Sequence, residues 1–305
     1  MNLLITGAFP CSPDQIGQIE GLGYSVTYVK DETVPLSKQG IALSGIEGVI
    51  CNSLFLKNPI EGFSHLKFIQ LTSAGYDRVP LEEIQKRNIK ICNARGVYSV
   101  PMAEFALCGV LQLYKQSPFF YENQKSHVWE KRRDLLELAG RTVCIVGCGS
   151  VGQECAKRFG AFGCRVIGID LAPFSQESFS AVYGLEEMDQ WLPMCDVVVL
   201  TLPLTPQTYH LFDGGRLSRF KEGCVLVNIA RGPVVEEEAL LEKLREGPLG
   251  GAVLDVFEEE PLDRDSPLWD AKHVILTPHN SFIGEGNRRR LWDVVYRNLK
   301  EYQGG

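Results

Sequence analysis

The 305-residue sequence lacks any run of 18 or more apolar residues, so it predicts no transmembrane helix. Basic residues are not in excess, since 31 lysines and arginines stand against 38 aspartates and glutamates, for a net charge of −7. Proteins whose main partner is nucleic acid favour a basic face. The first residues also lack the basic start of a signal peptide. We therefore expect a cytoplasmic protein with neither a membrane nor a nucleic-acid partner.

Metal and disulfide motifs are also missing. None of the ten cysteines forms a CxxC pair, and the five histidines show no paired ligand spacing. Several of the cysteines lie in or beside apolar runs, as small core residues do. The sequence therefore predicts reduced thiols, no disulfide framework and no bound metal.

The sequence does contain a regular alternation of short β-rich runs with helical stretches. This alternation predicts an α/β fold of parallel sheets with helices on both faces. The length favours two doubly wound domains, one at 1–96 that is completed by a C-terminal helix at 284–305, and one at 97–283. An apolar helix at 100–114 suggests burial between domains or subunits. The predicted strands are 3–6, 25–29, 48–51, 68–72, 89–92, 143–146, 166–170, 197–201, 225–229, 251–256 and 274–276.

A glycine-rich turn follows the apolar run at 143–146. Gly147, Gly149 and Gly152 form a GxGxxG pattern between a predicted strand and a predicted helix. The first glycine allows a tight turn, the second lets the backbone approach a pyrophosphate, and the third lets helix and strand pack closely. Asp170 ends the next predicted strand. An acid there hydrogen-bonds a ribose 2′-hydroxyl and repels a 2′-phosphate, so the sequence predicts NAD rather than NADP as the cofactor.

Three later strand ends carry polar residues, at 228–232, 255–261 and 277–280. In open α/β sheets, ligands bind beyond the carboxyl ends of the strands. Arg231 could bind a carboxylate through two N–H groups of its guanidinium, and His279 could transfer a proton near neutral pH. A nearby carboxylate would orient the imidazole and favour its charged form. One arginine, one acid and one histidine gathered there indicate the reduction of a carbonyl group.

Almost the whole chain resembles the D-isomer-specific 2-hydroxyacid dehydrogenase family. The resemblance is carried by the glycine turn with Asp170, by 228–232, by 255–261 and by Thr277-Pro278-His279. It implies a flavodoxin-like substrate domain, a Rossmann NAD-binding domain and hydride transfer between NAD(H) and C2 of a small 2-keto or 2-hydroxy acid. It also implies a homodimer. From its position before the cofactor domain, His127 is interpreted as structural or exposed, and the alternative is that His127 and Trp129 reach a neighbouring subunit's site.

The resemblance also implies roles for single residues. Arg231 would bind the substrate carboxylate, His279 would be the acid in reduction and the base in oxidation, and Glu260 would hydrogen-bond and tune His279. Asp255 resembles the acid that holds the nicotinamide carboxamide. A loop in the first domain would bind the carboxylate through its backbone N–H groups. The residues of this substrate loop are Ser73, Ala74 and Gly75. The implied cofactor-binding residues are Gly147, Gly149, Ser150, Val151, Gly152, Asp170, Leu202, Pro203, Ala230 and Asp255.

Two other interpretations stay open. Phosphoglycerate dehydrogenases often hold the phosphate with arginines, whereas the best-matching positions here are Asn52 and Leu71, both uncharged; Arg78 or Arg95 could substitute. We therefore favour glyoxylate, hydroxypyruvate or pyruvate over 3-phosphoglycerate. The second interpretation is a non-catalytic, dinucleotide-sensing binding protein on the same fold. Transcriptional corepressors of the C-terminal binding protein type resemble this family and keep similar residues.

Overall fold

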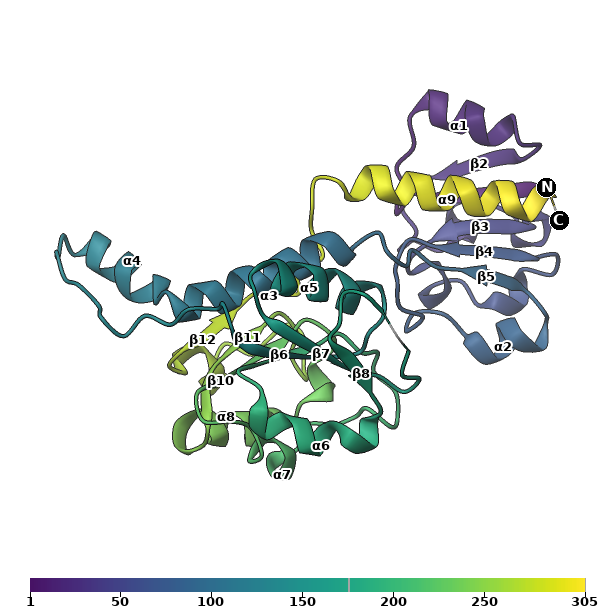
Figure 1. Cartoon of the computed structure of the whole chain (residues 1–305). Helices are drawn as coiled ribbons and strands as arrows, with labels where there is room; N and C mark the ends of the chain where they lie inside the picture. Colours follow the sequence, from purple (N-terminus) through teal and green to yellow (C-terminus); the bar gives the residue numbers. More distant parts are fainter. Residues whose placement is uncertain (175, 305) are drawn as a thin grey trace. The chain divides into compact units, whose positions relative to one another are not determined.

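Two parallel sheets organise the chain, and each belongs to its own unit (Figure 1). The computed structural model describes residues 1–174 and 176–304. The first unit contains residues 1–98 and the C-terminal segment that begins at Glu285, and the second contains Ser99–Gly284. The α/β class with two doubly wound parallel sheets, predicted from the alternation of apolar runs, is confirmed.

The first unit is built on a five-stranded sheet with the order β2-β1-β3-β4-β5. This is the order of flavodoxin-like sheets. All its strand pairs are parallel, and β3 and β4 are buried along their whole length, as strands covered on both faces are. The strands are β1 Asn2–Thr6, β2 Ser25–Val29, β3 Gly48–Cys51, β4 Phe68–Leu71 and β5 Lys90–Cys92, and the helices are α1 Pro13–Glu20, α2 Leu81–Lys86 and α9 Asn287–Gly304.

Helix α9 packs beside this sheet, although nearly two hundred residues separate it from β5 (Figure 1). Its apolar residues Leu291, Val295 and Leu299 recur every four positions and are buried in the core that contains Leu3 and Ile5 of β1. Residues at that spacing share one face of a helix. Burial of an aliphatic side chain contributes roughly 1.5–3 kcal/mol, so three such residues hold the helix in place.

The second unit is built on a seven-stranded sheet with the order β12-β11-β10-β9-β6-β7-β8. From its β8 edge, this is the Rossmann order 3-2-1-4-5-6 with one added strand. The strands are β6 Thr142–Val146, β7 Arg165–Ile169, β8 Ala181–Tyr183, β9 Val197–Leu200, β10 Cys224–Asn228, β11 Leu249–Leu254 and β12 Val274–Leu276. The helices are α3 Ser99–Tyr114, α4 Ser117–Lys125, α5 Ser150–Ala161, α6 Met188–Trp191, α7 Gly214–Leu217 and α8 Glu237–Glu246.

Helices cover both faces of this second sheet. Val143 and Ile145 of β6 belong to one hydrophobic core, which also contains residues of α3 and α5, whereas Cys144 and Val146 belong to the other. Successive side chains of a strand point to opposite faces, so this division shows a sheet buried on both sides. No helix in the described part of the chain is long and apolar enough to cross a membrane.

Several elements were absent from the sequence-based prediction. The polar stretch at 115–137 carries α4, and the segments 181–183 and 188–191 form β8 and α6. β8 has only three residues, all of them partly exposed, so it lacks the long apolar run that marks the other strands. All ten cysteines are free thiols, and six of them are buried: Cys51, Cys144, Cys148, Cys155, Cys195 and Cys224.

Candidate cofactor and catalytic site

Polar side chains follow three neighbouring strands of the second sheet. Arg231 comes three residues after β10, Asp255 directly follows β11, and His279 comes three residues after β12. These strands are adjacent and parallel, with Asn228 beside Leu254 and Leu254 beside Leu276. Their carboxyl ends therefore meet at one edge of the sheet, where open α/β proteins bind their ligands.

Asp255 is fully buried and holds the loop that carries His279. Its Oδ1 accepts hydrogen bonds from the Thr277 hydroxyl at 2.6 Å and from the Asn280 N–H at 2.7 Å. Its Oδ2 accepts one from the Ser281 N–H at 2.9 Å. Hydrogen bonds to an ionised carboxylate are among the strong ones in proteins. Both carboxylate oxygens are thus engaged by the loop 277–281.

His279 has a left-handed backbone, with φ of +50°, which is uncommon for a residue other than glycine. Its N–H donates to the Asp255 carbonyl at 2.8 Å, so the same aspartate also holds this backbone. On the imidazole, Nδ1 lies 2.8 Å from Oε2 of Glu260. The other oxygen of Glu260 accepts the Phe257 N–H at 3.2 Å. Glu260 is therefore oriented by its own loop and in turn orients the ring, which leaves Nε2 as the outward nitrogen.

The turn that carries Arg231 is held by a buried asparagine. Asn228 is 1% exposed, and its amide both donates to the Arg231 carbonyl and accepts the Ala230 N–H, each at 3.1 Å. The next residue, Gly232, lies against the Phe257 carbonyl so closely that a Cβ would come within 1.8 Å of the oxygen. The Arg231 turn and the Glu260 loop are thus packed together. Asn228 lies in the 228–232 motif, but this hydrogen-bonding role has no local sequence signal.

A second histidine contacts the Glu260 loop. Nε2 of His210 lies 3.0 Å from Oε1 of Glu258, which is close enough for an ion pair although the atoms are not aligned for a hydrogen bond. The same Glu258 oxygen accepts the Glu237 N–H at 2.9 Å. Burial raises the pKa of the Glu237 carboxyl above its usual range, and the neighbouring carboxylates of Glu258 and Glu259 add to this effect. This cluster was not predictable from the sequence, because His210, Glu237 and Glu258 are distant in the chain.

The glycine turn has the form that a dinucleotide requires. Gly147 has φ of +99°, and a Cβ there would lie 2.8 Å from the Leu202 nitrogen. A Cβ on Gly152 would lie 2.1 Å from the Gly147 carbonyl oxygen, which explains the close packing of α5 on the turn. A Cβ on Gly149 would meet nothing within 4 Å, so this side of the turn is open at the N-terminus of α5. Exposed N–H groups and the helix dipole make such an end suited to a phosphate.

Asp170 follows β7, which pairs with β6 along its length. Its Oδ2 accepts the Cys148 N–H at 2.7 Å, and Oδ1 accepts the Ala172 N–H at 3.2 Å. The carboxylate therefore lies beside the glycine turn. Burial and the Asp170 charge raise the pKa of the Cys148 thiol to about 12. These residues fit a dinucleotide whose pyrophosphate lies on the turn and whose ribose reaches Asp170.

Other predicted cofactor residues line the same edge of the second sheet. Thr201 donates its hydroxyl to the Gly147 carbonyl at 2.6 Å, which fixes the start of the segment that contains Leu202 and Pro203. The Leu202 side chain is part of the hydrophobic core, whereas Pro203 is exposed. Ala230 is buried between Asn228 and Arg231, and its carbonyl accepts a hydrogen bond from the Arg231 guanidinium at 2.8 Å. Ser150 and Val151 form the first turn of α5, and both are partly exposed.

The predicted substrate loop lies in the first unit, directly after β4. All three of its carbonyl groups have donors. The Ser73 carbonyl accepts the Ala94 N–H at 2.9 Å, the Ala74 carbonyl accepts the Asn93 amide at 2.7 Å, and the Gly75 carbonyl accepts the Ser73 hydroxyl at 3.0 Å. In a planar trans peptide, the N–H points opposite to the C=O. The N–H groups that follow these carbonyls therefore point away from their partners, as a carboxylate-binding loop requires.

Within residues 1–174 and 176–304, no group of three or more histidine, cysteine, aspartate or glutamate side chains could hold a metal ion.

The chain is similar in sequence and in fold to proteins of a known family. Residues 107–281 match the family model of the D-isomer specific 2-hydroxyacid dehydrogenase, NAD binding domain. A glyoxylate reductase of Korarchaeum cryptofilum is 32% identical over 290 residues, which cover 90% of this chain and 86% of that protein. A D-3-phosphoglycerate dehydrogenase of Methanocaldococcus jannaschii is also 32% identical, over 80% of this chain but only 47% of its own length. A family member from Aeromonas salmonicida has a solved structure with a TM-score of 0.82 and 32% identity, covering 100% of this chain and 96% of that chain.

Proposed function

Because the chain belongs to the D-isomer-specific 2-hydroxyacid dehydrogenase family, it is an NAD(P)-dependent oxidoreductase, and we propose that it reduces a small 2-keto acid with NADH. When bound, the nicotinamide supplies the hydride for C2 of the keto acid and accepts it in the reverse direction. The observation that supports this proposal most directly is the 2.8 Å contact of Glu260 with Nδ1 of His279, at the same carboxyl edge of the sheet as Arg231.

His279 supplies the proton in this proposal. Nδ1 is occupied by Glu260, so Nε2 of the imidazolium gives its proton to the carbonyl oxygen as the hydride reaches C2. The products are the hydroxyl group and a neutral imidazole. The Glu260 carboxylate stabilises the protonated ring before the transfer and keeps it oriented afterwards. In oxidation, the same nitrogen removes the hydroxyl proton.

Each unit by itself carries candidate donors for the substrate carboxylate. Arg231 offers a planar pair of N–H donors, which matches a carboxylate bidentately. The outward N–H groups that follow the engaged carbonyls of Ser73 and Ala74 offer backbone donors of the kind that bind carboxylates.

We propose that the cofactor preference is for NAD. Asp170 is held beside the glycine turn by the Cys148 N–H, and its second oxygen accepts the Ala172 N–H at 3.2 Å. A carboxylate there can accept hydrogen bonds from the adenosine ribose and repels the extra phosphate of NADP. Leu171, which follows, is 75% exposed and offers no positive charge to that phosphate.

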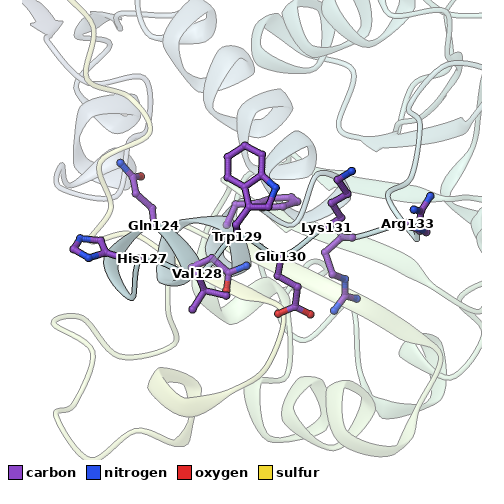
Figure 2. Close-up of a pocket in the computed structure, with 10 residues that line it drawn as sticks. Gln124, His127, Val128, Trp129, Glu130, Lys131 and Arg133 are labelled. Carbon is purple, nitrogen blue, oxygen red and sulfur yellow. The ribbon is translucent and has the colours of Figure 1, made fainter.

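We also propose that two copies of the chain associate. The arm formed by α4 and residues 126–133 leaves Trp129 94% exposed and Tyr121 58% exposed, and Figure 1 shows α4 beyond the end of α3. In Figure 2, Trp129 and Lys131 lie on one side of the extended segment, and Glu130 lies on the other. The arm carries both charge signs and large apolar groups, so it can be self-complementary across a two-fold axis. Sedimentation should give about twice the 34.0 kDa chain mass, and W129D should give the single mass.

The test of the proposed activity is NADH oxidation with a panel of keto acids. We expect turnover of glyoxylate, hydroxypyruvate or pyruvate, and much weaker turnover when NADPH replaces NADH. Tight NADH binding without turnover of any keto acid would contradict the proposal and favour a dinucleotide-sensing protein. Equal use of NADPH would overturn the role given to Asp170.

A further inference from the structure

The segment that contains His210 lies beside the chain that leaves the Arg231 turn. The His210 N–H donates to the Pro233 carbonyl at 2.8 Å. Two residues further on, the Phe212 carbonyl accepts the Glu236 N–H at 3.1 Å, and the two stretches form a short parallel bridge. The backbone of His210 is therefore fixed to the stretch that directly follows Arg231.

The imidazole of His210 reaches the loop that carries Glu260. Its Nε2 atom is buried and lies 3.0 Å from Oε1 of Glu258, which is two residues before Glu260. The ring stacks on Tyr209, with 4.1 Å between the ring centroids and 19° between the planes, so its orientation is restricted. His210 also has a left-handed backbone, with φ of +46°, which is uncommon for a residue other than glycine. One side chain thus connects the Arg231 turn to the Glu260 loop.

The surroundings of His210 are rich in carboxylates. Oε1 of Glu258 accepts the Glu237 N–H at 2.9 Å, and Oε2 of Glu237 accepts the Glu258 N–H at 3.4 Å, so these two acids lie near each other and repel. The charged residues on the two stretches packed against His210 are Arg231, Glu236, Glu237 and Glu238 on one, and Asp255, Glu258, Glu259 and Glu260 on the other. A carboxylate beside an imidazole favours its charged form, and that charge offsets the repulsion between the acids.

We propose that His210 is a positioning residue, whose imidazolium holds Glu258 and thereby keeps Glu260 within hydrogen-bond reach of Nδ1 of His279. This inference rests on the proposed function and adds a residue that acts through the Glu260 loop. Glu260 accepts the Phe257 N–H, so the loop moves as one piece and a displacement at Glu258 also displaces Glu260. Because the Glu260 carboxylate stabilises the protonated ring, its displacement lowers the fraction of His279 that carries a proton at a given pH.

The test is the pH dependence of kcat/KM for the best keto acid, measured with the full-length protein at saturating NADH. In H210N, asparagine tolerates the left-handed backbone but carries no charge. At neutral pH, kcat/KM should fall about 10-fold, because the proton donor is misplaced. The pH at which kcat/KM drops to half its plateau should lie about 0.5–1 pH unit below the wild-type value. The matched control is H65N, which should leave both quantities unchanged, because His65 contacts the Ser44 carbonyl on an exposed part of the first unit.

A second variant keeps the proposal open to refutation if H210N does not fold. E258Q removes the charge that His210 faces, on a side chain that is 33% exposed, and should shift the half-plateau pH in the same direction. The double variant H210N/E258Q should shift it no further than the larger single change, because both substitutions act on one contact.

The half-plateau pH separates positioning from a merely structural role. If H210N lowers the plateau but leaves the half-plateau pH unchanged, the proposal is overturned, and additive shifts in the double variant would overturn it too. A wild-type protein that turns over no keto acid would instead refute the proposed function, so the two failures are distinguishable.

Discussion

Replacing Asp255 with alanine should both destabilise the second unit and disable the His279 loop. The substitution removes an acceptor of three hydrogen bonds, from Thr277, Asn280 and Ser281, and leaves at least the buried Ser281 N–H without its partner. A buried donor left unsatisfied costs about 1–3 kcal/mol, and each hydrogen bond to a charged group contributes about 1.5–3 kcal/mol. After relaxation of the loop, we expect a loss of about 3–5 kcal/mol in the free energy of unfolding.

The catalytic effect of the same change follows from the position of His279. Its left-handed backbone is held by the Asp255 carbonyl and by the loop that the carboxylate anchors. A displacement of about 1 Å at a catalytic group can cost about 100-fold in rate, so kcat should fall by about that factor. In D255N, the shape is kept but one oxygen becomes a donor that faces a donor, so we expect an intermediate loss of stability and a clear loss of kcat.

Urea unfolding and steady-state kinetics together check this reasoning. D189A is the matched control, because Asp189 forms a partly exposed ion pair with Arg216, and its loss should cost at most about 1 kcal/mol. A large rise in the NADH KM of D255N with an unchanged kcat would show that Asp255 acts on the nicotinamide carboxamide instead. Wild-type stability and kcat in D255A would refute the loop-anchoring role altogether.

Three other predictions concern the carboxylate, the cofactor and the thiols. R231K should lower kcat/KM about 10- to 100-fold, because lysine keeps the charge but lacks the two parallel N–H donors of the guanidinium. Titration of the variant with substrate checks this. D170N should raise kcat/KM for NADPH relative to NADH by at least about 10-fold, because the charge that repels the 2′-phosphate is removed. Parallel assays with the two cofactors check this. Burial raises the pKa of the Cys148 thiol to about 12, so this thiol should stay protonated at pH 8. Peptide mapping after alkylation should therefore find exposed Cys108 labelled and Cys148 unlabelled.

Regular features of the fold were predictable from the sequence because each is a local pattern. Parallel strands buried on both faces are continuous apolar runs, and the glycine turn occupies six consecutive residues at 147–152. The strand-end positions of Arg231 and His279 followed from those runs. β8 was not predicted because its three residues are partly exposed and form no apolar run. They form a strand because they pair with β7.

The finer construction of the site depends on contacts between distant residues, which no local pattern contains. Asp255 meets the loop 277–281 because β11 and β12 end side by side. The ion pair of His210 with Glu258 likewise joins segments that are far apart in the chain.

The central claim is that His279 transfers the proton in the reduction of a 2-keto acid, and the most direct measurement is the kcat of H279N with NADH and the best keto acid. Asparagine tolerates the left-handed backbone at this position but cannot pass a proton, so kcat should fall about 10²- to 10⁴-fold. H273N is the matched control, since His273 also has a positive φ, +57°, but precedes β12. A kcat in H279N within about 3-fold of wild type, with NADH affinity intact, would contradict the account.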